Sequence, residues 1–147
     1  MVDKLVKRLD GKPLQMHPNC FYLSWEPPYT AIWTDIRNIK PKWSTTIKWK
    51  EMRGDIYIAS DQAPTDRFTL NIQNNYKNKS FLKSHLQKAV RRSNRYKALK
   101  TAYHFLDLDQ EDFLRRLAII AIEDSLPLQG FSTIIWLQIA LSKGYIL

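Results

Sequence analysis

The chain has 147 residues, of which 44% are hydrophobic and 12% aromatic, and its formal net charge is +9. This length is typical of a single domain, and the apolar content excludes an intrinsically disordered chain. The longest apolar run, FSTIIWLQIAL, is shorter than the roughly 20 residues that a membrane-spanning helix needs.

The compartment is predicted from the first residues and from cysteine usage. MVDKLVKRLDGKPL carries charges every few positions, so we expect no signal peptide. Cys20 is the single cysteine, which excludes an intrachain disulfide and favours a reducing environment. We therefore predict a soluble intracellular protein with no membrane partner.

The chain opens with a short segment of helical periodicity. Val2, Leu5, Val6 and Leu9 recur at helical spacing, and the pattern ends at Gly11. We expect a helical arm within residues 1–14, packed either on its own domain or on a neighbouring copy.

Residues 15–75 form a β-rich part in which apolar residues recur with a period of two. In WSTTIKWK, Trp43, Thr45 and Ile47 share one face, and the residues between them share the other. A tight turn is predicted at Met52-Arg53-Gly54-Asp55. The pattern predicts a small antiparallel sheet of about five strands. They are expected near residues 21–25, 30–36, 44–52, 55–60 and 67–73.

Residues 76–147 form a helical part, which makes the predicted fold class α+β in one domain. The first helix is expected over residues 80–92, with an interruption at Ser93-Asn94 and a second helix through Tyr96 and Leu106. Asp109 is a predicted N-cap, and Gly144 a predicted left-handed residue after the last helix, 132–143.

The third of these four helices is FLRRLAIIAIED. It is apolar nearly all round from Leu117 to Ile122, so we expect it to be the buried centre of a four-helix unit.

The positive charge is concentrated in one stretch, YKNKSFLKSHLQKAVRRSNRYKALK, at residues 76–100. It holds nine basic and no acidic residues, whereas the other stretches mix both signs. A block of one sign creates a local field that attracts polyanions, and phosphate contact requires only positive donors within reach. The predicted nucleic-acid-binding residues are Lys77, Lys79, Lys83, Lys88, Arg91, Arg92, Arg95, Lys97 and Lys100.

Other uses of this basic block stay open. One alternative is that the block is a solvated helix face. Others are that it binds an acidic protein or a membrane surface, or that it pairs with acidic residues of the same fold. Glu123 and Asp124 end the third helix, where the helix dipole disfavours acids, so Arg91, Arg92 and Arg116 are candidate partners for them.

Tryptophans in the β-rich part provide an alternative binding surface. Trp25, Trp33, Trp43 and Trp49 occur near basic residues, and aromatic rings on a basic sheet can stack unpaired bases. We favour the view that Trp43 and Trp49 face the core, because the lysines occupy the other face. Possible additional binding residues here are Lys42, Lys48 and Lys50.

Signals for catalysis, metals or cofactors are missing from the sequence. His17, His85 and His104 are far apart and have no metal-ligand spacing with the cysteine, and no glycine-rich phosphate-binding loop occurs. His85 falls on the apolar side of its helix, which is typical of a core histidine. We predict no catalytic residues, no metal and no cofactor.

The words LQKAVRRSNRYKALKTAYHFL and RRLAIIAIED, within residues 86–124, resemble the C-terminal helical region of the RarA/MgsA clamp-loader-like ATPases. The similarity covers about a quarter of the chain and lacks the ATPase domain, so it implies a helical assembly module associated with DNA but no ATP chemistry. The positions that match the RarA/MgsA motifs are Leu86, Lys88, Ala89, Arg91, Ser93, Ala98, Leu99, Arg115, Arg116, Leu117, Ala121, Glu123 and Asp124. Separately, RRLAIIAIED and WLQIALSKGY are similar to small proteins of large nucleocytoplasmic DNA viruses, including marseilleviruses.

Together these features predict a non-enzymatic, sequence-independent double-stranded DNA-binding protein that acts as a homodimer or larger oligomer. In a virus it would be genome-associated, located in the virion, host cytoplasm or nucleus. The apolar residues of the last helix, Phe131, Ile134, Ile135, Trp136 and Ile139, are expected to pack on a second copy. The alternatives are an adaptor that binds an acidic protein, and a single-stranded nucleic-acid or RNA binder that uses the tryptophans.

Overall fold

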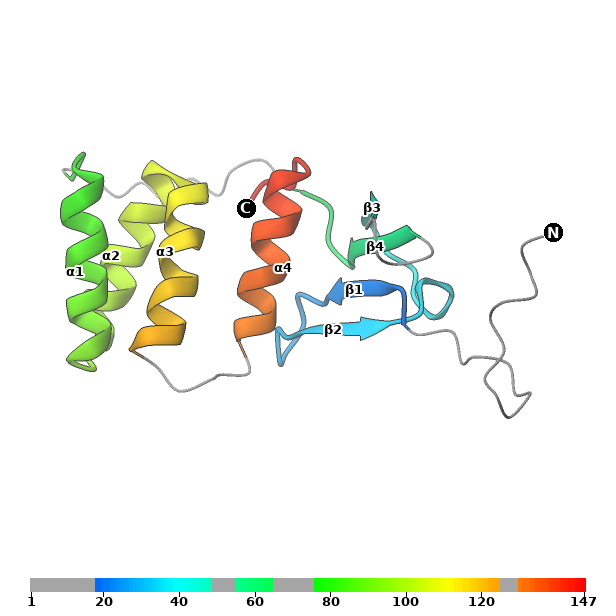
Figure 1. Ribbon diagram of the computed structural model, residues 1–147, viewed down its shortest axis with the longest axis horizontal. Helices are drawn as coiled ribbons and strands as arrows, with labels where there is room; N and C mark the ends of the chain where they lie inside the picture. The colour runs from blue at the N-terminus through cyan, green and yellow to red at the C-terminus, as the bar shows by residue number, and fades with distance from the viewer. Residues whose placement is uncertain (1–17, 49–54, 65–75, 125–129) are drawn as a thin grey trace.

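A computed structural model describes residues 18–48, 55–64, 76–124 and 130–147 (Figure 1). The predicted N-terminal arm, the predicted strand at 67–73 and residues 52–54 of the predicted turn lie outside the described residues. Within them the chain forms four strands followed by four helices, which confirms the α+β class.

The sheet is mixed rather than purely antiparallel. Its strands are β1 (Cys20–Leu23), β2 (Ala31–Thr34), β3 (Trp43–Lys48) and β4 (Asp55–Ser60), in the order β2-β1-β4-β3. The β1–β2 and β3–β4 pairs are antiparallel, but β1 and β4 are parallel, so the prediction of an antiparallel sheet is wrong for this pair. The connection from β2, which contains the short helix η1 (Ile36–Asn38), leads past β1 to β3 at the opposite edge of the sheet. Strand β4 then pairs with both β3 and β1, and it runs in the same direction as β1.

The alternation of side chains along β3 is confirmed. Trp43, Thr45 and Ile47 are partly buried, whereas Ser44 and the other intervening residues are exposed. Strand β3 pairs along its whole length with β4, from Trp43 opposite Ser60 to Lys48 opposite Asp55. One face of this hairpin therefore contributes to the core.

The helix limits follow the sequence signals closely. The helices are α1 (Lys79–Arg91), α2 (Arg95–Leu108), α3 (Gln110–Glu123) and α4 (Phe131–Ser142). The Asn78, Asn94 and Asp109 side chains cap the first three by accepting a backbone N–H bond two or three residues ahead. Gly144, after α4, has the left-handed φ of 86° that was predicted for it.

Helix α4 lies between the sheet and the other three helices (Figure 1). On the sheet side, Trp136 and Ala140 pack in one buried cluster with Phe21 and Ile58. Leu137 and its neighbour one turn on, Leu141, also pack against a second cluster formed by α1, α2 and α3. A helix covered on two sides must be apolar nearly all round, as α4 is.

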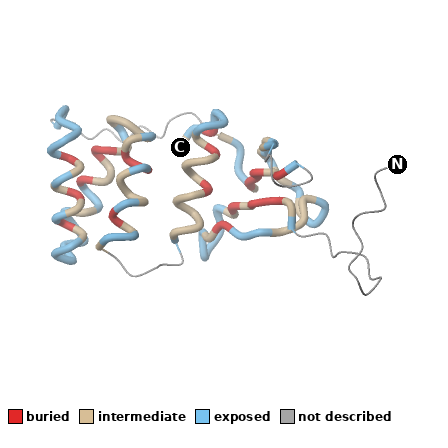
Figure 2. Tube along the Cα trace, in the orientation of Figure 1, coloured by how far each residue is buried: buried red, intermediate tan, exposed pale blue. Residues whose placement is uncertain are grey.

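Two packing expectations are corrected here, one for α3 and one for a single residue of α4. Helix α3 is not the buried centre, because its outer side faces solvent: Ile122 is 70% exposed and Ile119 is also exposed (Figure 2). Trp136 is fully buried within its own chain and so is not available to a second copy. The other apolar residues predicted for that contact are only partly buried, so the packing of α4 on a second copy stays a prediction.

Candidate functional site

One flank of α1 binds the acidic residues of α3. The two helices run parallel and start at the same end of the bundle. Successive turns of α1 therefore lie beside successive turns of α3. Lys79 Nζ lies 2.5 Å from Asp109 Oδ2, and Lys83 Nζ lies 2.7 Å from the corresponding oxygen of Asp112. Near the other end, Arg91 Nε donates to Asp124. Lys79, Lys83 and Arg91 therefore form ion pairs within the fold. This corrects the prediction that they are free to bind phosphate.

Gln87 continues this row of contacts between Lys83 and Arg91. Its Nε2 donates to Glu123 at 3.0 Å and to Asp124 at 2.8 Å, and its Oε1 accepts from Arg116. The hydrogen bond from Arg91, followed by that from Gln87, lowers the pKa of Asp124. Two of the predicted partners of Glu123 and Asp124 are thus found. Arg91 binds Asp124 directly, and Arg116 is linked to both acids through Gln87.

The opposite flank of α1 faces α2 and carries different residues. A cavity of about 140 Å³ lies there, and none of the described residues that line it is a carboxylate. Three of its lining side chains are basic: Lys88 and Arg92 from α1, and Lys97 from α2. The others are His85, Ala89 and Asn94.

A second cavity, of about 220 Å³, adjoins the first along the α1–α2 contact. His85 and Lys97 line both cavities, and Lys100 borders only the second. No carboxylate lines this cavity either. Its remaining lining residues are Tyr76, Phe81, Leu82, Tyr96, Thr101 and His104.

Hydrogen bonds hold His85 where the two cavities meet. Thr101 donates its hydroxyl to the Lys97 carbonyl at 2.7 Å, so its oxygen accepts from His85 Nδ1, also at 2.7 Å. This places the proton of a neutral His85 on Nδ1 and leaves Nε2 as an acceptor. His85 was predicted to be a core histidine; it is hydrogen-bonded as expected, but it is only partly buried.

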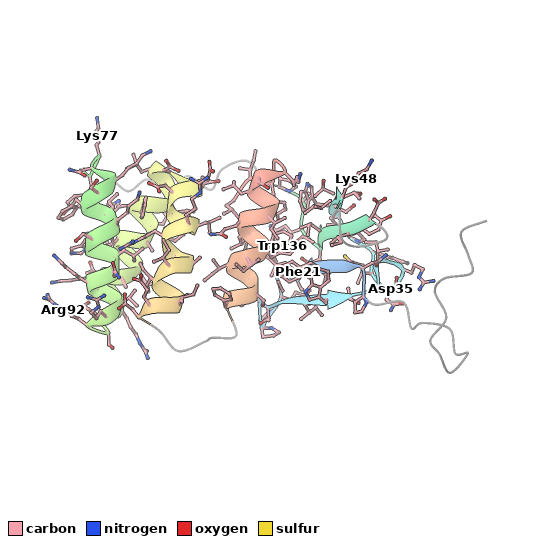
Figure 3. All side chains as sticks on the ribbon, viewed as in Figure 1. Phe21, Asp35, Lys48, Lys77, Arg92 and Trp136 are labelled. Atoms are coloured by element: carbon pink, nitrogen blue, oxygen red, sulfur yellow. The ribbon has the colours of Figure 1, made fainter. Side chains whose placement is uncertain are left out.

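Six of the nine predicted cations form no ion pair with any residue in the described part of the chain. They extend along α1 and α2; Figure 3 labels Lys77 and Arg92 at opposite ends of α1. We call them the α1–α2 cation set: Lys77, Lys88, Arg92, Arg95, Lys97 and Lys100.

The start of α2 strengthens the positive field of this set. A helix N-terminus carries a partial positive charge that acidic residues usually offset. The first turn of α2 has no acidic residue and instead contains Arg95 and Lys97. Positive charge therefore accumulates at the corner between α1 and α2 without an internal counter-charge among the described residues.

Of the possible additional residues on the sheet, Lys48 lies away from this surface. Lys42 and Lys48 are exposed, but Lys48 lies across α4 from α1 (Figure 3), and Lys50 is outside the described residues. Trp43 faces the core, 4.8 Å from the Tyr145 ring centroid, as we favoured, and Trp49 is outside the described residues.

The other two tryptophans of the sheet region also have partners within the fold. Trp33 stacks on Phe21 at a centroid distance of 5.1 Å, and Trp25 donates its indole N–H to Tyr145. The three described tryptophans of the sheet region therefore do not form one exposed stacking surface.

The aromatic residues of the larger cavity were not among the predicted site residues. Phe81, Tyr76 and Tyr96 are all exposed. The available signal was the occurrence of these rings within the basic block itself.

Comparisons of the chain with protein-family models, curated proteins and solved structures give no match. The similarity to the RarA/MgsA helical region therefore stays a prediction from residues 86–124. In the described residues no cluster of three metal-ligating side chains occurs, and no helix is long and apolar enough to cross a membrane.

Proposed function

We propose that this chain is a non-enzymatic protein that binds double-stranded DNA without sequence specificity. The α1–α2 cation set contacts the phosphates. The observation that carries the proposal is the separation of charge across α1. The acids of α3 neutralise one flank, and among the described residues no carboxylate lines the cavities of the other.

A duplex fits this surface better than an isolated anion does. Helix α1 has 13 residues and is therefore about 20 Å long, so cations at both of its ends reach several phosphates of one duplex. Lysine and arginine contacts to phosphate do not distinguish sequences, because every nucleotide presents the same phosphate. Binding through this surface is expected to be general and strongly dependent on salt.

The homo-oligomeric state is part of the proposal, and the partly buried apolar residues of α4 are the surface expected to support it. A two-fold assembly would present two cation sets and so double the phosphate contacts. Sedimentation with and without duplex tests this part, and a monomer under both conditions would contradict it without affecting the binding surface.

Fluorescence anisotropy with a labelled 20-base-pair duplex tests DNA binding. If each cation of the set neutralises one phosphate, log K falls with log salt concentration with a slope of about −5. Lys88→Gln/Arg92→Gln should weaken binding to all duplexes alike and reduce that slope by about 1.8.

The matched control is Lys79→Gln/Lys83→Gln, which removes the same charge from the α3 flank of the same helix. It should keep most of the affinity and nearly the same slope. Equal loss in both double variants, or no duplex binding at low salt, would refute the proposal.

An adaptor that binds an acidic protein through the same cations is the second candidate function. It is favoured by the same absence of carboxylates around both cavities. A co-purifying partner that persists after nuclease treatment would support the adaptor, whereas loss of the bound material would support DNA binding.

A further inference from the structure

Three parallel rings line the larger cavity between α1 and α2. Tyr76 stacks on Phe81 with ring centroids 5.6 Å apart and an interplanar angle of 13°. Phe81 in turn stacks on His85 at 5.5 Å and 21°. Tyr96, from the first turn of α2, borders the same cavity and is 74% exposed.

Tyr76 and Phe81 contact each other and the neighbouring histidines, but like Tyr96 they lie outside the buried core. Neither buried cluster of the described residues includes Tyr76, Phe81 or Tyr96, and all three are exposed. Large apolar rings that gather on a basic surface point to a ligand with both flat rings and negative charge.

We infer that this cavity binds an unpaired nucleobase from a single-stranded end or overhang next to the bound duplex. The inference rests on the proposed function. Aromatic rings stack on every base in a sequence-tolerant way, and Lys97 and Lys100 border the same cavity, where they meet the phosphates that accompany the base. Because Lys97 lines both cavities, the base site continues directly from the duplex surface.

The chemistry of the cavity selects an unpaired base. Bases within a duplex are stacked on their neighbours and paired, so their faces are not accessible to protein rings. A frayed end, gap or overhang exposes those faces. The chain is therefore expected to prefer the boundary between double-stranded and single-stranded DNA over a blunt duplex.

The test compares three labelled DNAs of one duplex sequence: blunt, with a three-thymidine overhang, and with a three-residue abasic overhang. The abasic overhang keeps the added phosphates and lacks only the bases. We expect the thymidine overhang to bind about tenfold more tightly than the abasic one, since one stacked base strengthens binding by roughly 5- to 150-fold.

Phe81→Ala and Tyr96→Ala should remove this preference and leave affinity for the blunt duplex within about twofold. Leu99→Ala is the matched control: Leu99 is on the same helix as Tyr96, is 72% exposed and does not line the cavity. It should retain the full preference.

Equal affinity for thymidine and abasic overhangs, or a preference that survives both aromatic substitutions, overturns this inference and leaves duplex binding intact. Absence of binding to all three DNAs overturns the proposed function together with it.

Discussion

Arg91 donates its Nε–H to Asp124 Oδ1 at 2.8 Å, so the side chain of Arg91 is directed to α3. The next residue, Arg92, instead lines the cavity on the α2 side. Adjacent residues on a helix differ by about 100° in direction, which assigns these two cations to different neighbours. Arg91 ends a row of internal ion pairs, whereas Arg92 belongs to the surface that we propose binds DNA.

Replacement of Asp124 by Asn is expected to destabilise the fold more than replacement of Asp112. The Asp124 side chain is only 7% exposed and accepts from both Arg91 and Gln87. Asp112 pairs with Lys83 in a more exposed position, where an ion pair contributes less than about 1 kcal/mol. Urea unfolding of both variants measures the order, and a larger loss for Asp112→Asn would contradict it.

Acid is expected to destabilise the α1–α3 contact. The backbone N–H of Asp112, and then Lys79, lower the pKa of Asp109, and Arg91 and Gln87 lower that of Asp124. A carboxylate with a lowered folded-state pKa stabilises the fold above its unfolded-state pKa of about 3.9. That contribution is lost as pH falls through the lower, folded-state pKa.

Thermal unfolding followed from pH 6 to pH 2 should therefore show a melting temperature that falls mainly below pH 4. The double variant Asp109→Asn/Asp124→Asn should start lower and show a flatter profile. An unchanged acid profile in this variant would show that other groups govern acid unfolding.

Ser93 joins α1 to α2 with a left-handed φ of 53°, while its N–H donates to Val90. Residues with a side chain pay roughly 1–2 kcal/mol for this conformation, and glycine does not. Ser93→Gly should stabilise the fold by roughly 0.5 kcal/mol, because the greater flexibility of glycine in the unfolded chain offsets part of the relieved strain. Ser93→Val should destabilise it by about 1 kcal/mol or more. Chemical unfolding checks both signs, and stabilisation by valine would refute the argument.

Trp136 should be among the most sensitive positions for stability. It is fully buried, and its indole N–H donates to the Phe21 carbonyl at 3.0 Å. Trp136→Ala is expected to cost about 3–5 kcal/mol, and Trp136→Phe, which removes this hydrogen bond, about 1–3 kcal/mol.

Trp33→Phe provides the control for Trp136, because Trp33 is 52% exposed. It should change the free energy of unfolding by less than about 1 kcal/mol. Comparable losses at the two positions would contradict the packing described here.

The Cys20 thiol should be unreactive in the folded protein. It is fully buried, and this burial, with a smaller effect of Asp35, raises its pKa to about 11. Iodoacetamide at pH 8 should label the folded protein at least roughly 100-fold more slowly than the urea-unfolded one, since the thiolate is the reactive form. Similar rates in both states would show that the strand opens readily.

Local features of the fold were predictable, since their signals lie within a few residues. The cap at Asp109, the break at Ser93-Asn94 and the alternation along β3 depend on neighbours in sequence. The parallel pairing of β1 with β4 was not predictable, because a period of two identifies a strand but not the strand beside it.

The candidate site was only partly predictable for the same reason. A helical wheel places Lys83 and Lys88 in one polar half, but it does not show that α3 covers part of that half. The exposure of Phe81 likewise depends on how α2 packs beside α1. Composition identified the charged stretch, and tertiary neighbours decided which of its members pair internally.

The position of α4 also has a consequence for the order of folding. The hydrogen bond from Trp136 to Phe21 joins residues 115 positions apart, so the sheet acquires its covering helix from a late part of the chain. At roughly 5–20 residues per second, a ribosome would leave β1 waiting on the order of ten seconds for Trp136. Contacts of such long range slow folding, and in that interval the nascent strands would depend on chaperones to stay unaggregated.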